Sequence, residues 1–192
     1  MKLEEMDYSS GSHVNCKEIE RLALEIGFSH TAPVNMDSLI PMPEIREMCA
    51  ADRCRNYGRS WSCPPSPVCG TPEEAGRRMK SFREGLLLQY TRQMENSFDL
   101  EEIESAEKCH KQMFDTLIRQ IRKMGVSCLP MTSGGCRRCY KCTYPDRACR
   151  YPDRLYVSME AYGLWVSEVC WKSGLAYNYG ENTITYTACV LI

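Results

Sequence analysis

Four cysteines in the second half of the chain have a spacing that suits thiolate ligation of a metal centre. Cys136, Cys139 and Cys142 are each separated by two residues, and Cys149 follows after six more. Thiolates at positions i, i+3 and i+6 of an irregular loop can turn toward one small centre, and a fourth cysteine downstream can close it from another side. The spacing therefore predicts a cysteine-ligated metal centre of the kind that iron-sulfur clusters require.

The same four cysteines allow more than one metal. A structural zinc ion usually takes two well-separated Cys-x2-Cys pairs, whereas three cysteines at two-residue intervals are typical of the bacterial ferredoxin run C-x2-C-x2-C-x3-C-P. Here the gap before Cys149 is six residues instead of three, and Arg150, not proline, follows it. We expect a [4Fe-4S] cluster, with zinc as the first alternative and metal-free cysteines as the second.

A second group of four cysteines lies in the first half of the chain, separated by four, eight and five residues. Its members are Cys49, Cys54, Cys63 and Cys69. Either all four are ligands of a second centre, or Cys69 is a bystander, because it lies beyond Pro64 and Pro65 in a stretch that is typical of an exposed loop. In that second case a cubane would keep one iron without a thiolate, and an open coordination position is what chemistry at a metal requires. A cysteine-rich loop without metal is the remaining alternative.

The chain has thirteen cysteines in 192 residues, and whether they form disulfides or bind metal depends on the redox state of the compartment. The first ten residues are acidic and do not lead into an apolar run, so we expect neither an export signal nor a membrane span. In a reducing cytoplasm, clustered thiols indicate metal ligands and not disulfides, and an odd count fits a disulfide framework poorly. The formal net charge of -1 gives no overall case for nucleic-acid or membrane binding.

The elements that must position the two loops can be read from periodicity and capping signals. Helices are predicted at Lys17–Ile26 with Asn15 as N-cap, from Pro41 to Met48, at Thr71–Phe82 and at Ile103–Met124. Short strands are predicted at Phe28–Val34, in the apolar run after Gly85, and at Val126–Met131. The order strand, long helix, strand favours a βαβ crossover with parallel strands. Because sites collect beyond the carboxyl ends of such strands, the two cysteine loops are expected to face each other there.

The last third of the chain adds a helix and a hairpin to this arrangement. Tyr156–Gly174 reads as one helix or as two short ones broken at Gly163, and Leu175–Ile192 reads as a β-hairpin that turns at Gly180–Thr183. The fold class expected from the whole pattern is α/β: a mixed sheet with a βαβ crossover, a C-terminal β-hairpin and two cysteine-rich metal-binding loops. We expect one domain over residues 1–192, with the loops at 49–69 and 136–149.

Two sequence stretches resemble a known family. They are CRNYGRSWSCPP in the first half and GGCRRCYKCTYPDRACRYPDR running into SMEAYG in the second. With them, nearly the whole chain resembles a cysteine-rich family of bacterial and archaeal proteins described only as predicted metal-binding proteins of unknown function. The resemblance implies no reaction. It implies metal binding by the matching cysteines, which are Cys49, Cys54, Cys63, Cys136, Cys139, Cys142 and Cys149.

The function expected from these residues is redox chemistry with a partner protein. Two [4Fe-4S] clusters would accept and pass single electrons; the alternatives are a cluster-dependent enzyme with an open iron in the first loop, and a zinc-stabilised interaction protein. Cationic residues crowd the second loop and would stabilise an anionic cluster or dock an acidic partner: Arg137, Arg138, Lys141, Arg147, Arg150 and Arg154. An RNA-binding zinc module is disfavoured by the spacing and the near-zero net charge. His110, on the apolar face of the long helix, is expected to be a core histidine.

Overall fold

The structure is a computed structural model that describes residues 15–192. It has a five-stranded mixed sheet in the order β1-β2-β5-β3-β4. The strands are β1 (His30–Pro33), β2 (Gly85–Gln93), β3 (Leu129–Thr132), β4 (Val157–Ser158) and β5 (Thr183–Leu191). β5 pairs antiparallel with β2 along its whole length and antiparallel with β3 at its end, whereas β3 and β4 are parallel. The last strand of the chain is therefore the centre of the sheet.

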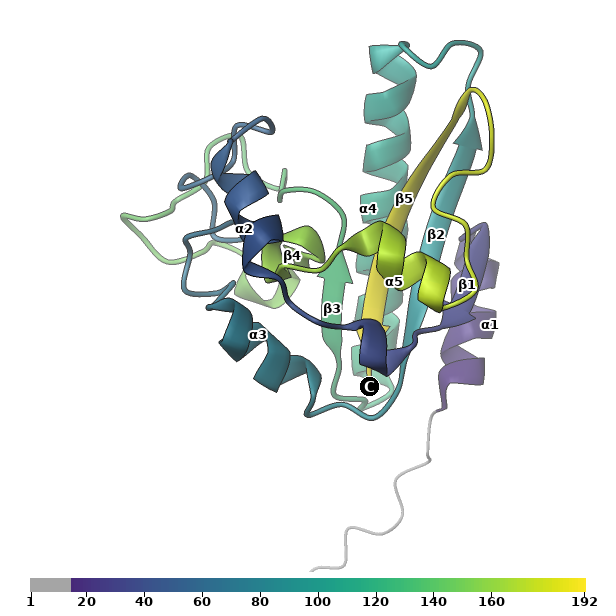
Figure 1. Cartoon of the computed structure of the whole chain (residues 1–192), viewed down its shortest axis with the longest axis horizontal. Helices are drawn as coiled ribbons and strands as arrows, with labels where there is room; N and C mark the ends of the chain where they lie inside the picture. The colour runs from purple at the N-terminus through teal and green to yellow at the C-terminus, as the bar shows by residue number, and fades with distance from the viewer. Residues whose placement is uncertain (1–14) are drawn as a thin grey trace, which may run out of the picture.

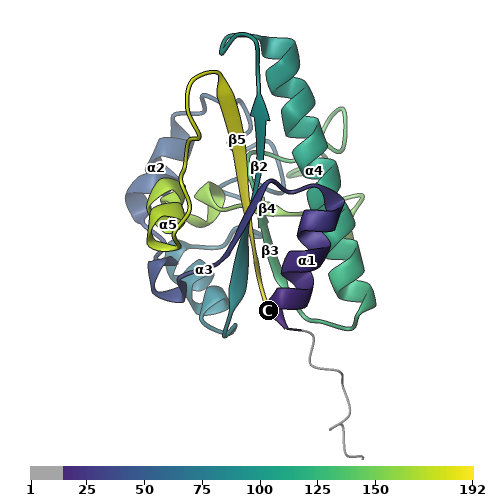
Figure 2. The ribbon, with the colours of Figure 1, turned by 90° about the vertical axis from the view of Figure 1, so that its right-hand side faces the viewer.

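Helices cover both faces of this sheet. They are α1 (Cys16–Ile26), α2 (Pro43–Ala50), α3 (Pro72–Met79), α4 (Leu100–Lys123) and α5 (Val166–Lys172), with short 3-10 turns η1 (Met36–Ser38), η2 (Pro152–Arg154) and η3 (Glu160–Tyr162). α1 and α4 lie on one face, and α2, α3 and α5 lie on the other (Figure 2). The molecule is thus built in three layers.

The helix ends follow the signals in the sequence. The Asn15 side chain accepts a hydrogen bond from the Glu18 amide at 3.1 Å, and Gly27 ends α1 in the left-handed conformation with φ of 117°. Thr71 and Glu74 form a reciprocal capping box at the start of α3. These helices begin and end within a few residues of their predicted bounds, and the predicted strand after the first helix is β1.

Two hydrophobic clusters, one on each face, hold the layers together. Alternate residues of β2 divide between them: Leu86 and Leu88 pack with Phe114 and Ile118 of α4, whereas Leu87 packs into the cluster under α3 and α5. This is the period-2 alternation of a strand that is buried on both sides.

The predicted crossover is confirmed, with one addition. β2 and β3 both run antiparallel to β5, so they are parallel to each other, and α4 connects them. They are not neighbours, because β5 lies between them. The sequence pattern predicted their direction but not the strand inserted between them.

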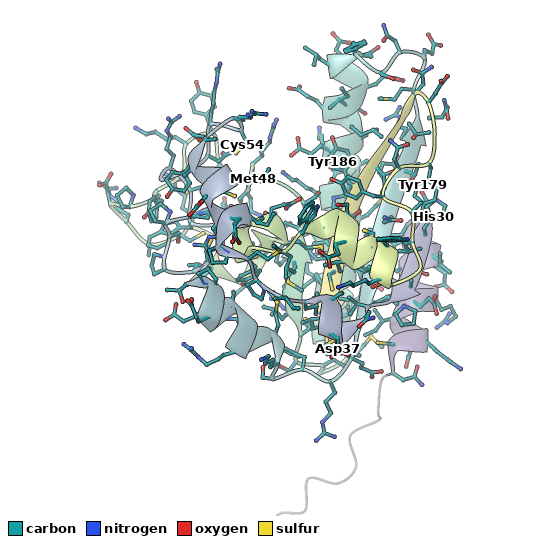
Figure 3. All side chains as sticks on the ribbon, viewed as in Figure 1. His30, Asp37, Met48, Cys54, Tyr179 and Tyr186 are labelled. Atoms are coloured by element: carbon teal, nitrogen blue, oxygen red, sulfur yellow. The ribbon has the colours of Figure 1, made fainter. Side chains whose placement is uncertain are left out.

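The predicted C-terminal hairpin is wrong. Its second arm is β5, but within the described residues its first arm, from Leu175, forms no strand. That arm instead binds a side chain of the sheet: the Gln89 Nε2 group donates to the Ala176 carbonyl at 2.8 Å, and the Tyr179 hydroxyl donates to Gln89 Oε1 at 2.7 Å. Tyr179 also stacks on His30 of β1, with ring centroids 4.0 Å apart, as Figure 3 shows. The residues of this arm that favour strands thus make side-chain contacts with the sheet instead of pairing as a strand.

Among residues 15–192, no helix is both long enough and apolar enough to cross a membrane. The expected lack of an export signal concerns the first residues of the chain, which lie outside the described part.

Candidate metal centre

The two cysteine loops lie side by side, beyond the β3 and β4 edge of the sheet (Figure 1). The first loop follows α2 and runs to α3, and the second follows β3 and runs to η2. The proximity expected from the topology is therefore present. We call the two loops together the cysteine lobe.

All four cysteines of the second loop line one small hollow. Cys136, Cys139, Cys142 and Cys149 share it with Ser60 and Trp61 of the first loop. Its volume is about 20 Å³, roughly the room of one water molecule. The structure thus brings together the four residues that the spacing singled out, and it adds a wall contributed by the other loop.

A buried serine joins the two loops. The Ser62 Oγ atom accepts a hydrogen bond from the Cys136 amide at 3.0 Å and lies 3.6 Å from the Cys63 Sγ atom. It also pairs with the Ser60 hydroxyl at 3.1 Å, and both serines are almost fully buried. One hydroxyl thus connects a candidate ligand of each loop.

Trp61 makes a second connection. Its indole Nε1 group donates to the Arg147 carbonyl at 3.0 Å, and its ring packs edge-on against Tyr144 at 5.0 Å. The approach is also close at Gly135, where an added Cβ would lie 2.9 Å from the Asn56 side-chain nitrogen. Glycine at this position lets the two loops touch.

The four cysteines of the first loop form a graded series in exposure. Cys54 is exposed, Cys49 is half-buried, and Cys63 and Cys69 are buried. Figure 3 shows Cys54 at the outer end of the lobe, near Met48 of α2. Burial raises the pKa of Cys49, and the charges of Glu160 and Cys54 add to the effect. Burial also raises the pKa of Cys63, while the hydrogen bond with Ser62 opposes it.

Cys69 does not lie in an exposed loop, as its place beyond the prolines indicated. It is fully buried in the hydrophobic cluster that contains Ala75, Met79 and Tyr162. Burial raises the pKa of Cys69 to about 12, with the charge of Arg46 opposing. A thiol in such surroundings behaves as a small hydrophobic side chain. The prediction is wrong because the chain stays in the protein interior on both sides of the prolines, where Cys63 and Ser66 are also buried.

The donor set suits a metal that prefers thiolates. All thirteen cysteines are free thiols, and eight of them lie in or beside the lobe. Within residues 15–192, no three Cys, His, Asp or Glu side chains form a group that could hold a single metal ion as they stand. Soft sulfur donors in this number match zinc or iron-sulfur chemistry and not the oxygen ligands of calcium or magnesium.

A buried carboxylate anchors the second loop to the body of the protein. Asp115 of α4 accepts hydrogen bonds from Arg138 at 2.9 Å, from Arg154 Nε at 3.0 Å and from the Tyr156 hydroxyl at 3.2 Å. Burial alone would raise the pKa of Asp115, but the hydrogen bond from Arg154 and the charges of both arginines hold it below its usual value. Arg138 and Arg154 therefore bind this carboxylate and also contribute positive charge near the cysteines.

Sequence reasoning missed Ser62 and Asp115. The only signal for Asp115 was a lone acid inside the apolar run of the long helix, and nothing marked Ser62 apart from its place beside Cys63. The prediction that His110 is a core histidine is confirmed: it is fully buried, with Nδ1 3.3 Å from the Ser133 hydroxyl. Outside the loops, Cys170 and Cys189 are buried, while Cys109 and Cys128 are half-buried against the cluster around α4.

One comparison with known proteins gives a match. The family model described as "Predicted metal-binding protein (DUF2284)" matches residues 32–192, which include both cysteine loops and the four strands from β2 to β5. No curated protein and no solved structure matches the chain.

Proposed function

The chain belongs to this DUF2284 family of predicted metal-binding proteins, and on that premise we propose that it is an iron-sulfur protein that transfers electrons. The observation that carries the proposal is that Cys136, Cys139, Cys142 and Cys149 line one hollow. Their spacing up to Cys142 is that of ferredoxin-type clusters. A [4Fe-4S] cluster bound there would supply reversible one-electron chemistry.

The first loop would hold the second cluster. The charge of Cys54 raises the pKa of both Cys49 and Cys63, and that of Cys63 raises the pKa of Cys49, which makes the three near neighbours. The charge of Cys136 likewise raises the pKa of Cys63, so the two sites adjoin. Two adjoining redox centres form a path along which an electron can enter at one loop and leave at the other.

The surroundings support the redox assignment. Four thiolates leave an oxidised cubane with a net charge of about -2, which nearby cations stabilise. Arg138 and Arg154 border the hollow. Trp61, which also borders it, would keep water from one side of a cluster. The exposed cations Lys141, Arg147 and Arg150 would then face an acidic redox partner.

The test is the content of iron, acid-labile sulfide and zinc per chain in protein purified without oxygen. About eight irons and eight sulfides are expected for two cubanes, with broad absorption near 400 nm. About four of each would support one cluster and leave the other loop to another metal or none. Zinc without sulfide would overturn the redox proposal.

One observation favours zinc as the alternative. The hollow among the second-loop cysteines is small, about 20 Å³. A single ion needs less room than a cubane, and a structural zinc would fix the two loops against each other without redox chemistry. The same metal analysis separates these possibilities.

Another observation favours an enzyme. Cys69 belongs to the hydrophobic core, which leaves Cys49, Cys54 and Cys63 as the natural ligands of the first loop. A cubane with three thiolates has one iron open to a substrate. If Cys69→Ser leaves the cluster content unchanged while Cys63→Ser loses a cluster, the enzyme is favoured. Equal losses in the two variants favour two closed electron-transfer centres.

A further inference from the structure

A cavity lies between α4 and the second cysteine loop. Its volume is about 650 Å³, within the range of sites that hold small organic molecules. Along α4 its lining extends from Glu101 to Asp115, about 21 Å at the rise of an α-helix. Gly135 and Cys136 line its other side, so the cavity adjoins the candidate metal centre without being part of it.

The end of the cavity beside the loop carries a surplus of positive charge. Two carboxylates there are each paired with two cations that also line the cavity. Glu107 lies 2.5 Å from Lys111 and 3.3 Å from Arg137. Asp115 lies 2.9 Å from Arg138 and 2.5 Å from Arg154. These four cations and two carboxylates together carry a net charge of +2, and over the whole lining five cations face four carboxylates.

One hydrogen-bond donor of a residue that lines this end has no partner. The Nε atom of Arg138 is buried and has no hydrogen-bond partner, although Nη2 of the same group binds Asp115. A buried guanidinium N–H without an acceptor is costly, and an anionic oxygen is the acceptor that suits it best. The opposite end, at Glu101 and Glu104, is acidic and would direct an anion toward the arginine end.

We propose that this cavity binds a small molecule through a carboxylate or phosphate group, placed against Arg138 next to Cys136. The rigid α4 wall and the salt-bridged loop form the site in advance, and its cations, of which Arg138 and Arg154 also border the cysteine hollow, select an oxyanion. A molecule held there would lie beside the second cysteine loop, where a redox centre could act on it. The binding itself does not depend on which metal the loops hold.

The experiment is calorimetric titration of the full chain, as purified, with inorganic phosphate and separately with malonate, with ionic strength held constant by sodium chloride. Saturable binding of one anion per chain is expected. Phosphate alone would identify a phosphorylated ligand, and malonate alone a carboxylic acid. Failure of both to bind saturably would overturn the proposal.

Two variants locate the site. Arg138→Gln should weaken binding tenfold or more, since it removes a charged donor. Its control, Arg147→Gln, removes the same charge from an exposed position of the same loop that does not line the cavity, and should leave binding unchanged. If both variants weaken binding equally, the anion is attracted only by the general charge of the loop and the proposal fails.

A steric variant keeps the test decisive if Arg138→Gln disturbs the loop. Gln112 is on α4 and lines the cavity, so Gln112→Trp should fill it and abolish binding. Gln120→Trp makes the same change two turns further along the helix, outside the cavity, and should bind as the unchanged chain does. Binding that survives Gln112→Trp would overturn the assignment. Metal analysis of the same samples separates the two proposals. A chain that contains zinc and binds phosphate would support the anion site and contradict the redox proposal.

Discussion

The two cysteine loops are held in different ways, although each has four cysteines. The first loop is continuous with the hydrophobic core: Cys63 and Cys69 are buried, and Cys69 packs among apolar side chains. The second loop contributes no residue between Gly134 and Tyr151 to either core cluster, and its cysteines are only half-buried around a hollow. Hydrophobic burial can therefore fix the first loop, whereas the second has mainly hydrogen bonds and salt bridges to hold it, together with the metal that we propose it binds.

Chelation of the metal that we propose the loops bind tests this difference most directly. We expect chelation to raise the rate of tryptic cleavage in the second loop tenfold or more, because that loop has exposed Lys141, Arg147 and Arg150 and little apolar burial. Cleavage at Arg53 and Arg55 of the first loop should rise much less. Mass spectrometry of the fragments locates the cuts. Equal acceleration in both loops would contradict this difference between them.

Cys69→Ser tests the core role of the first loop. A hydroxyl in place of the buried thiol should lower the free energy of unfolding by about 2 to 3 kcal/mol, because it buries a polar group among apolar side chains. Denaturant unfolding measures it. Cys142→Ser is the matched change in the second loop, where it should reduce metal content and cost less once the metal has been removed from both proteins. Equal costs in the metal-free proteins would show that both loops are packed alike.

Ser62→Ala tests the bridge between the loops. It leaves the Cys136 amide without its buried acceptor and should cost about 1 to 2 kcal/mol. The exposed Ser127→Ala is the control and should be neutral. The same Ser62 variant should also loosen the second loop to trypsin without exposing Cys69 to alkylation. A neutral Ser62→Ala would mean that the loops are held together by other contacts.

The smallest effect concerns pH and the start of the second loop, where Ser133 contacts His110. Burial, and then the charge of Lys111, lower the pKa of His110 to about 3 in the folded chain, well below its usual value of 6.5. As the pH falls from 6.5 toward 3, the unfolded chain takes up a proton that the folded chain does not, so stability falls by at most about 1.4 kcal/mol per pH unit. Thermal unfolding between pH 7 and 5 should show this slope, and His110→Phe should reduce it. An unchanged slope in His110→Phe would assign the slope to another group.

The sequence pattern was most informative where one local rule decided the outcome. Asn15, Thr71 and Gly27 mark helix ends because capping needs only neighbouring residues. The long helix followed from its apolar period, and the second-loop hollow from two-residue spacing. In each case the partners lie within a few residues of one another, so a short window of sequence contains them.

The features that the pattern missed depend on partners far apart in the chain. The hydrogen bond from Cys136 to Ser62 joins residues 74 positions apart, and that from Arg154 to Asp115 joins residues 39 apart. The arm at Ala176 and Tyr179 was read as a strand because its residues favour strands, but Gln89 of β2 binds its polar groups. Propensity describes what a residue prefers locally and does not say which distant group will bind it.

The central position of β5 has a consequence for how the protein forms during synthesis. β1 and β2 can pair early, and β3 and β4 can pair separately, but β5 alone joins the two pairs, and it follows all four of them in the sequence. Both cysteine loops are therefore translated while the sheet that supports them is still in two halves. Such long-range closure is slow compared with local folding. We therefore expect that any metal the loops bind is fixed in place only when β5 joins the two halves of the sheet.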